Sequence, residues 1–77
     1  MNIAVLGAGS WGTALAIQLG VSGDRVRQWD RQAERAAITQ ARRENARYLP
    51  GIALPENITV TGSLEQALDG AVLVVEV

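Results

Sequence analysis

The feature that most constrains the fold of this chain is a glycine pattern near its N-terminus. Gly7, Gly9 and Gly12 match G-x-G-x-x-G directly after an apolar run at residues 2–6. An apolar run of this kind is typical of a strand buried on both faces of a parallel sheet. After such a strand, the three glycines predict a tight turn, a close backbone approach to a pyrophosphate and close helix packing. The alternative is that they only connect a strand to a helix.

The remainder of the chain alternates between strand-like and helix-like patterns. Continuous or alternating apolar residues indicate strands, and apolar residues three to four positions apart indicate helices. Ser10 and Asp30 are the predicted N-caps of the first two helices, and residues 63–66 have the spacing of a capping box. We expect strands at 2–6, 25–29, 58–61 and 71–77, helices at 13–20, 31–44 and 63–69, and a long loop at 45–57.

The first two predicted helices differ in how clearly they mark an inward face. In the first, Leu15, Ala16 and Leu19 face one side. The second is rich in alanine, with good helix propensity and weak amphipathicity. Its expected inward stripe consists of Ala33, Ala37, Ile38 and Ala41.

The order of the predicted elements is βαβαβαβ, which is typical of the α/β class. Right-handed crossovers between parallel strands then give a Rossmann-type doubly wound parallel sheet with strand order 3-2-1-4. A chain of 77 residues has room for one small domain, so we expect residues 1–77 to form a single unit.

Composition excludes several classes of function. The chain has seven arginines, no lysine, eight acidic residues and a net charge of −1, so nucleic-acid binding is not expected. Because cysteine and histidine are absent, we assign no metal site, thiol nucleophile or imidazole base. Any chemistry must use other groups, and we assign no catalytic residue. No apolar stretch approaches about 20 residues, and no basic segment precedes residues 2–6. We therefore expect a cytoplasmic protein without membrane insertion.

Three further residues bear on how the glycine pattern would hold a nucleotide and on which nucleotide it would be. Asp30 lies 18 residues beyond Gly12, where a carboxylate either accepts a hydrogen bond from a ribose 2′-hydroxyl or caps the next helix. Arg31 either contacts a 2′-phosphate or adenine, or is solvated. Both NAD and NADP therefore remain open as the cofactor. Trp11, inside the glycine loop, packs either beneath the loop, which we favour, or against a ligand.

Several segments together resemble one enzyme family. They are the run Gly-Ala-Gly-Ser-Trp-Gly-Thr-Ala-Leu-Ala at 7–16, Trp29, the segment Asn-Ala-Arg-Tyr-Leu-Pro-Gly at 45–51, and Leu-Pro at 54–55. A tryptophan in the glycine loop, combined with N-x-x-Y-L-P at this distance, is far more specific than the glycines alone. Over essentially its whole length, the chain resembles the N-terminal NAD(P)-binding segment of NAD(P)-dependent glycerol-3-phosphate dehydrogenases.

The resemblance implies a reaction for the parent enzyme and contacts for this chain. The parent would interconvert dihydroxyacetone phosphate and sn-glycerol 3-phosphate by hydride transfer with NAD or NADP, in glycerophospholipid synthesis. Cofactor contacts would fall on the loop 7–12, above all on Ser10 and Trp11, on Arg31 and on Tyr48. For Tyr48, an aromatic plug in the core is the alternative.

Two departures from the family pattern limit what this chain does alone. Glu76 stands where the family's fourth strand has an apolar residue, and a buried charge there would be costly. The family's catalytic lysines and substrate domain lie beyond residue 77. We therefore expect this chain to be the N-terminal part of a dinucleotide-binding domain, inactive by itself. Its exposed fourth strand would favour pairing with a second copy in a homo-oligomer.

Three alternatives remain open at the level of sequence. One is a non-catalytic nucleotide-binding module, which the absence of lysine favours. Another is a related reductase of the same superfamily that acts on a hydroxy acid or sugar acid. The last is a folding or assembly fragment that neither binds a nucleotide nor takes part in catalysis.

Overall fold

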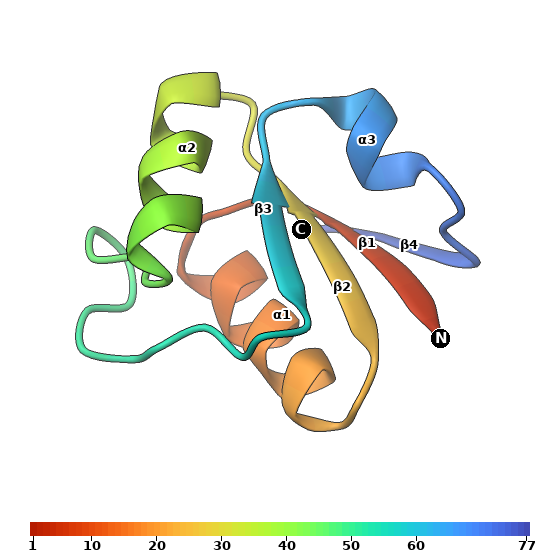
Figure 1. Ribbon diagram of the computed structural model, residues 1–77, viewed down its shortest axis with the longest axis horizontal. Coiled ribbons are helices and arrows are strands. Elements are labelled where there is room, and N and C mark those ends of the chain that lie inside the picture. Colours follow the sequence, from red (N-terminus) through yellow and green to blue (C-terminus); the bar gives the residue numbers. More distant parts are fainter.

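The computed structural model describes residues 1–77 and confirms an α/β fold built on one sheet (Figure 1). Every strand pairing is parallel, and the strand order is β3-β2-β1-β4, as predicted for a Rossmann-type sheet. The elements are β1 (Asn2–Leu6), α1 (Ser10–Val21), β2 (Arg25–Trp29), α2 (Ala33–Arg42), β3 (Ile58–Thr61), α3 (Leu64–Leu68) and β4 (Leu73–Glu76).

The first three strands have the predicted bounds, but the two longer helices begin elsewhere. α1 begins earlier than expected, and its N-cap is Gly9, so the assignment of Ser10 as the cap was wrong. The Ser10 hydroxyl instead donates to Tyr48 O, at 3.2 Å. α2 has Gln32 as its N-cap rather than Asp30. The reason is that the Asp30 carboxylate accepts a hydrogen bond from the Gln32 N–H and closes a turn before the helix.

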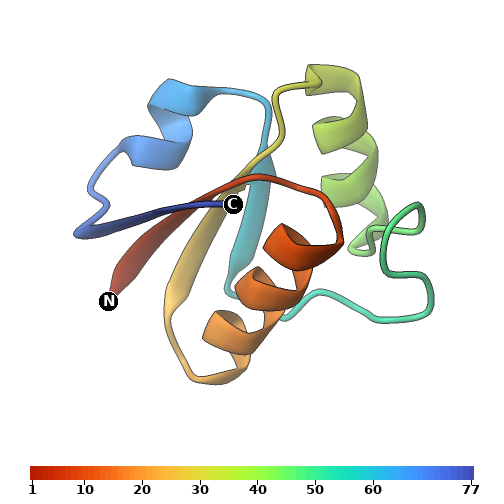
Figure 2. The ribbon, with the colours of Figure 1, turned by 180° about the vertical axis from the view of Figure 1, so that it is seen from behind.

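The hydrophobic core lies between one face of the sheet and the helices α1 and α2. Alternate residues of a strand point to the same face, and on this face Ile3 and Val5 of β1 are buried. α3 packs over β1 and β2 on the other face, as right-handed crossovers require (Figures 1 and 2). The core cluster consists of Ile3, Val5, Ala16, Val26, Ala36, Leu54, Ile58 and Val60.

The inward face of α1 agrees in part with the prediction. Ala16 is fully buried, and Leu19 is half-buried and packs against the core cluster. Leu15 is half-buried as well. The small residues Gly12, Ala16 and Gly20, rather than the leucines, therefore form most of the buried face of α1.

The inward face of α2 differs from the predicted stripe. Its buried residues are Ala36 and Thr39. The helix is clearly amphipathic, contrary to the expectation from the sequence, but contacts at its two ends rather than the apolar stripe fix its orientation. Near its start, Asp30 binds Arg35, and just past its end the Arg43 guanidinium donates to two backbone carbonyls at 2.8 and 2.7 Å. The predicted stripe is exposed at all four positions: Ala33, Ala37, Ile38 and Ala41.

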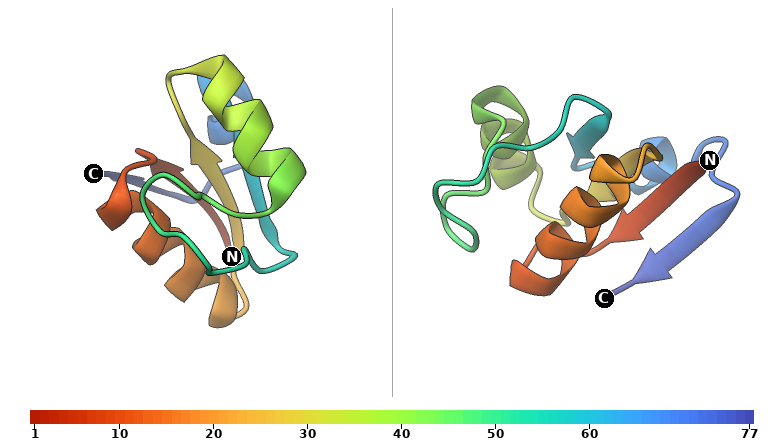
Figure 3. Two further views of the ribbon diagram at one scale, coloured as in Figure 1. Left: turned by 90° about the vertical axis from the view of Figure 1, so that its left-hand side faces the viewer. Right: turned by 90° about the horizontal axis from the view of Figure 1, so that it is seen from below.

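β4 is an edge strand that pairs only with β1 (Figure 3). Its outer edge lacks a backbone partner, and Val72, Leu73 and Val74 are 71%, 45% and 47% exposed. Glu76 is exposed too, so the cost expected for a buried charge does not arise. This edge therefore combines unpaired backbone groups with apolar side chains.

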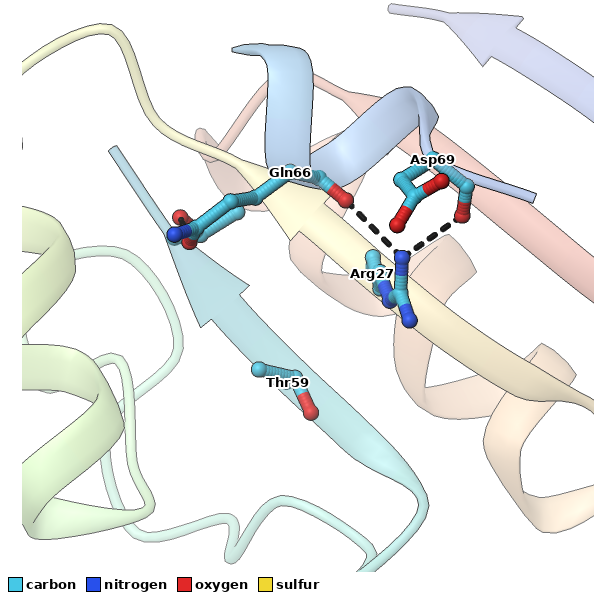
Figure 4. Close-up of a pocket in the computed structure, with 5 residues that line it drawn as sticks. Arg27, Thr59, Gln66 and Asp69 are labelled. Atoms are coloured by element: carbon cyan, nitrogen blue, oxygen red, sulfur yellow. Dashed lines mark hydrogen bonds between the residues drawn. The ribbon is translucent and has the colours of Figure 1, made fainter. Parts of the chain in front are cut away.

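An arginine on the face opposite the core fixes α3 to the sheet. Arg27 Nη1 donates to Gln66 O at 3.0 Å and to Asp69 O at 2.6 Å, at the C-terminal end of α3 (Figure 4). The last carbonyls of a helix lack partners within it, and a cation there also interacts favourably with the helix dipole. Arg27 and Thr59 line a recess of about 310 Å³ beside this contact. The guanidinium in this recess is therefore engaged as a cap of α3.

We predict that Arg27→Ala lowers the free energy of unfolding by about 1–2 kcal/mol, because two carbonyls lose a charged donor. Urea unfolding followed by circular dichroism measures this loss. Arg25→Ala is the matched control, since Arg25 lies on the same strand and face but is exposed. We expect the control to change the free energy of unfolding by less than about 0.5 kcal/mol. Equal losses in the two variants would contradict the capping role.

Candidate functional site

A cleft opens where the carboxyl ends of β1, β2 and β4 meet the loop before α1. Its volume is about 250 Å³. In open parallel sheets, ligands bind at the carboxyl ends of the strands, where the strand order reverses. Here β1 and β4 form that reversal point. Among the residues that line the cleft are Gly7, Asp30, Arg31 and Arg35.

The glycines of the loop have different physical roles. Gly7 has a φ of +146°, which side chains rarely adopt, as the tight turn out of β1 requires. A Cβ at position 12 would overlap the carbonyl oxygen of Gly7, so Gly12 lets α1 lie close to the end of β1. Gly9 has a φ of −76°, and no heavy atom lies within 4 Å of the place a Cβ would take. The protein thus leaves the space beside Gly9 open.

The first turn of α1 has free amide groups. No side chain caps this helix, and its first backbone bond joins Thr13 N–H to Gly9 O at 3.0 Å. The N–H groups of residues 10–12 accordingly have no partner within the chain. α3 differs, because the Ser63 hydroxyl accepts a hydrogen bond from the Gln66 N–H. Free N–H groups and the positive end of the helix dipole favour an anion at the start of α1.

A buried polar network holds the glycine loop from the inner side. Gln28 Nε2 donates to Gly7 O and Asn45 Nδ2 donates to Ala8 O, both at 2.9 Å. The same two amide groups also donate to Thr13 Oγ1, at 3.2 and 2.9 Å. All three side chains are buried. Because C=O and N–H of a trans peptide point in opposite directions, inward carbonyls leave the next N–H groups of the loop facing outward.

Asp30 is engaged on both carboxylate oxygens. Arg35 donates from Nε to Oδ2 at 2.6 Å and from Nη2 to Oδ1 at 3.0 Å. The Gln32 N–H also donates to Oδ1, at 2.9 Å. The Asp30 side chain is 2% exposed and that of Arg35 is 24% exposed. Asp30 therefore belongs to the wall of the cleft, while Arg35 is the partner that solvent can reach.

Burial and these partners act in opposite directions on the pKa of Asp30. Burial raises the pKa, whereas hydrogen bonds from Arg35 and the Gln32 N–H, with the charges of Arg35 and Arg31, lower it. The result is a pKa below the ordinary value of 3.8. The hydrogen bond to Asp30 in turn raises the pKa of Arg35. The two groups form a charged pair.

Tyr48 lies between two arginines. The guanidinium carbons of Arg35 and Arg47 are 5.6 and 5.4 Å from the centre of its ring, within the range of cation–π contacts. The ring is half-buried and does not belong to the core cluster, so the alternative of a core plug was wrong. Tyr48 contacts the site through Arg35.

Trp11 does not pack beneath the loop. Its side chain is 83% exposed, which corrects the favoured prediction. The reason is that the buried polar network already fills the space under the loop. Trp11 and Ser10 line a separate groove of about 270 Å³ with Ala14 and Leu49. The structure thus brings Gly7, Asp30 and Arg31 into one cleft but places these two residues on a neighbouring surface.

Sequence reasoning missed two residues of this site. Arg35 was not assigned, because it lies five residues beyond Asp30, outside the three- or four-residue spacing of ion pairs within a helix. Asn45 was noted only as part of the sequence motif that resembles the family, without a role of its own. Its contact with Ala8 O joins residues 37 positions apart, which no local pattern indicates.

The parallel sheet, the glycine loop and the cleft at the strand ends define a Rossmann-type domain. Sequence comparison identifies the family within this class. The family described as NAD-dependent glycerol-3-phosphate dehydrogenase N-terminus matches residues 2–77. The chain belongs to this family, which confirms the resemblance seen in the sequence.

Relatives and solved structures agree with this assignment. Glycerol-3-phosphate dehydrogenase (NAD(P)+) of Halorhodospira halophila is 57% identical over 69 residues, covering 90% of this chain and 21% of the relative. That of Geobacillus thermodenitrificans is 53% identical over 74 residues, covering 96% and 22%. The crystal structure of the Coxiella burnetii glycerol-3-phosphate dehydrogenase superposes with a TM-score of 0.93 at 40% identity, over 97% of this chain and 23% of that one. The Plasmodium falciparum enzyme gives 0.87 at 29% identity, over 100% and 24%.

The chain therefore spans about a fifth of the length of the curated relatives that it matches. None of its helices has the length and apolar character needed to cross a membrane. No three or more acidic, histidine or cysteine side chains gather as a metal site would require.

We predict that Asp30→Asn makes the stability of the chain less dependent on pH in the acid range. A carboxylate with a lowered pKa stabilises the fold fully above its ordinary pKa of 3.8, and this contribution falls as the pH decreases through the lower pKa of the folded chain. Denaturant unfolding measured at intervals of about one pH unit between pH 3 and pH 7 shows the effect. The wild-type chain should lose more stability than the variant below about pH 4. Parallel curves would contradict the charged pair.

Proposed function

We propose that this chain binds NAD or NADP in the cleft, with the pyrophosphate at the first turn of α1. The observation that carries the proposal is the open space beside Gly9, next to the partnerless N–H groups of residues 10–12. A pyrophosphate needs close backbone approach, N–H donors and a favourable dipole, and this turn offers all of them. The family description and the names of the relatives support the same cofactor.

The proposal gives each candidate residue a role. The loop 7–12 holds the pyrophosphate through its backbone, with Ser10 and Trp11 contributing N–H donors from the first turn. The exposed Trp11 ring lies on the same turn and would cover one side of the ligand. Arg31, which lines the cleft next to β2, would contact the adenosine end. Tyr48, whose ring contacts the Arg35 guanidinium, would lie beside it.

We further propose that the chain is the nucleotide-binding part of an enzyme that interconverts dihydroxyacetone phosphate and sn-glycerol 3-phosphate. The bound cofactor would supply or accept the hydride through its nicotinamide ring. This chain's residues bind and orient the nucleotide, while the substrate contacts and the proton transfer belong to other parts of the enzyme. Family membership supports this proposal, and the chain matches only about a fifth of each relative.

The edge of β4 supports a proposal about assembly. Its unpaired backbone and the exposed Val72, Leu73 and Val74 favour pairing with a further strand, supplied either by later residues of a longer chain or by a second copy. A homo-oligomer, a cytoplasmic location and a part in glycerophospholipid synthesis all stay predictions.

We predict that Gly9→Val lowers the affinity for NADH and NADPH by about 100-fold or more. The added methyl groups fill the space that the pyrophosphate would take, and hydrogen bonds from N–H groups to a charged ligand are lost. Isothermal titration of the wild-type and variant chains with each nucleotide measures the change. Because Gly9 is the N-cap of α1, a loss of stability of about 1 kcal/mol is expected as well. Circular dichroism at the titration temperature shows that both chains are folded.

Ala37→Val is the matched control for this test, because Ala37 lies on the exposed face of α2 and the change also adds a Val side chain. Its affinities should equal those of the wild-type chain. Unchanged binding in Gly9→Val would contradict the position of the pyrophosphate. Absence of binding to either nucleotide by the folded wild-type chain would favour an assembly fragment.

A chimera tests the enzymatic role. The matching segment of the Halorhodospira halophila dehydrogenase is replaced by residues 1–77 of this chain, and oxidation of NADH or NADPH is followed with dihydroxyacetone phosphate. We expect turnover within about tenfold of the unmodified enzyme, since the binding loop is intact. Nucleotide binding without turnover would favour the non-catalytic module. Turnover with a hydroxy acid in place of dihydroxyacetone phosphate would favour the related reductase.

A further inference from the structure

The acid at the end of the second strand is not free to bind a ligand in this chain. A carboxylate has about four acceptor positions. On Asp30, two are taken by Arg35 and one by the Gln32 N–H. The side chain is 2% exposed, so little of the carboxylate is accessible from the cleft that it lines.

This arrangement changes what the acid can do at the ribose end of a nucleotide site. An unpaired acid there accepts a hydrogen bond from the ribose 2′-hydroxyl and repels a 2′-phosphate. Asp30 is poorly suited to either role, because three of its acceptor positions are occupied, its side chain is almost fully buried, and its charge is compensated by Arg35 at hydrogen-bond distance. The repulsion by which an unpaired acid at this position excludes a phosphorylated ribose therefore does not arise here.

The charges that remain at this end of the cleft are positive. Arg31 and Arg35 both line the cleft with Asp30, which gives two cations against one anion. The other acid in the cleft wall is Glu76 on β4, and β1 separates β4 from β2. Two strand spacings, about 10 Å, thus separate Glu76 from the end of β2. Glu76 does not cancel the local positive charge.

Arg35 is also fixed in place. Its guanidinium is held by Asp30 through two hydrogen bonds and lies 5.6 Å from the centre of the Tyr48 ring. The side chain still has 24% of its surface exposed. One edge of the planar guanidinium is held by Asp30, and its remaining N–H donors are well suited to bind a phosphate.

We infer that Arg35 determines the nucleotide specificity of the cleft: by pairing with Asp30 it removes that acid from ribose recognition, and it adds the charge that accepts a 2′-phosphate. The inference rests on the proposed binding of NAD or NADP and names which of the two the site is built to accept. NADPH should bind at least as tightly as NADH. Arg35 is a positioning residue for Asp30 and a contact for the phosphate.

The test compares nucleotide affinities of the wild-type chain and Arg35→Gln by isothermal titration. We expect the affinity of the variant for NADPH to fall by about tenfold or more, because a charged donor is lost and Asp30 regains its negative charge toward the cleft. Affinity for NADH should stay unchanged or rise, since the released carboxylate accepts the ribose hydroxyl. Equal losses for both nucleotides would show a purely structural role and overturn the inference.

Further variants separate the two parts of the inference. Asp30→Asn should leave the NADH affinity within about twofold of wild type. A large loss of NADH affinity would show that Asp30 binds the ribose and would overturn the inference. Arg35→Lys keeps the positive charge and should restore most of the NADPH preference. Arg42→Gln, an exposed arginine in the last turn of α2, is the control and should change neither affinity.

A buried carboxylate without its partner can prevent folding, and a double variant covers that case. Asp30→Asn with Arg35→Gln leaves no unpaired charge, and it should bind NADPH about tenfold more weakly than Asp30→Asn alone. Equal NADPH affinity in the two would overturn the inference. If the folded wild-type chain binds neither nucleotide, the proposed function fails with it. If the wild-type chain binds both and no variant changes their ratio, only the present inference fails.

Discussion

The conformation of the glycine loop depends on one buried oxygen. Thr13 Oγ1 accepts hydrogen bonds from the side-chain amides of Gln28 and Asn45, and these amides also hold the two loop carbonyls of Gly7 and Ala8. Buried polar groups destabilise a fold unless they are paired, and every buried side-chain polar atom of this chain has a partner. The network thereby joins α1, β2 and the loop after α2 at a single point. Displacing any of the three elements would leave buried donors or acceptors without partners.

The same network orients two peptide groups of the loop. Peptide groups are planar, so the Gly7 and Ala8 carbonyls that the network draws inward turn the N–H groups of Ala8 and Gly9 outward. It also explains why Asn45 and Tyr48 are three residues apart. Asn45 ties its segment to Ala8 O, while the Tyr48 carbonyl accepts the hydroxyl of Ser10, so the tyrosine is anchored beside the loop from two directions. A motif that looks like an irregular loop in the sequence therefore positions an aromatic ring at the site.

The sheet could be predicted from the sequence because its signals are local. The strand at 2–6 is continuous in its apolar character, and the strand order then follows from the handedness of the crossovers. The orientation of α2 could not be predicted, because Asp30 and Arg43 at its two ends set it, rather than its apolar stripe. The exposure of Trp11 was mispredicted for a similar reason. Polar side chains from distant segments occupy the space beneath the loop, and only the folded chain brings them together.

Asp30 shows why position alone does not define a functional residue. From the sequence it was either a ribose acceptor or a helix cap, and both roles need a carboxylate with free acceptor positions. In the structure, Gln32 is the cap residue, and Arg35, five residues beyond Asp30, donates to both carboxylate oxygens. The chemistry at the end of β2 is therefore that of an ion pair whose exposed member is the arginine. Since Arg31 adds a second cation and the acid is already neutralised, the end of this cleft next to β2 carries a positive charge despite the aspartate in its sequence.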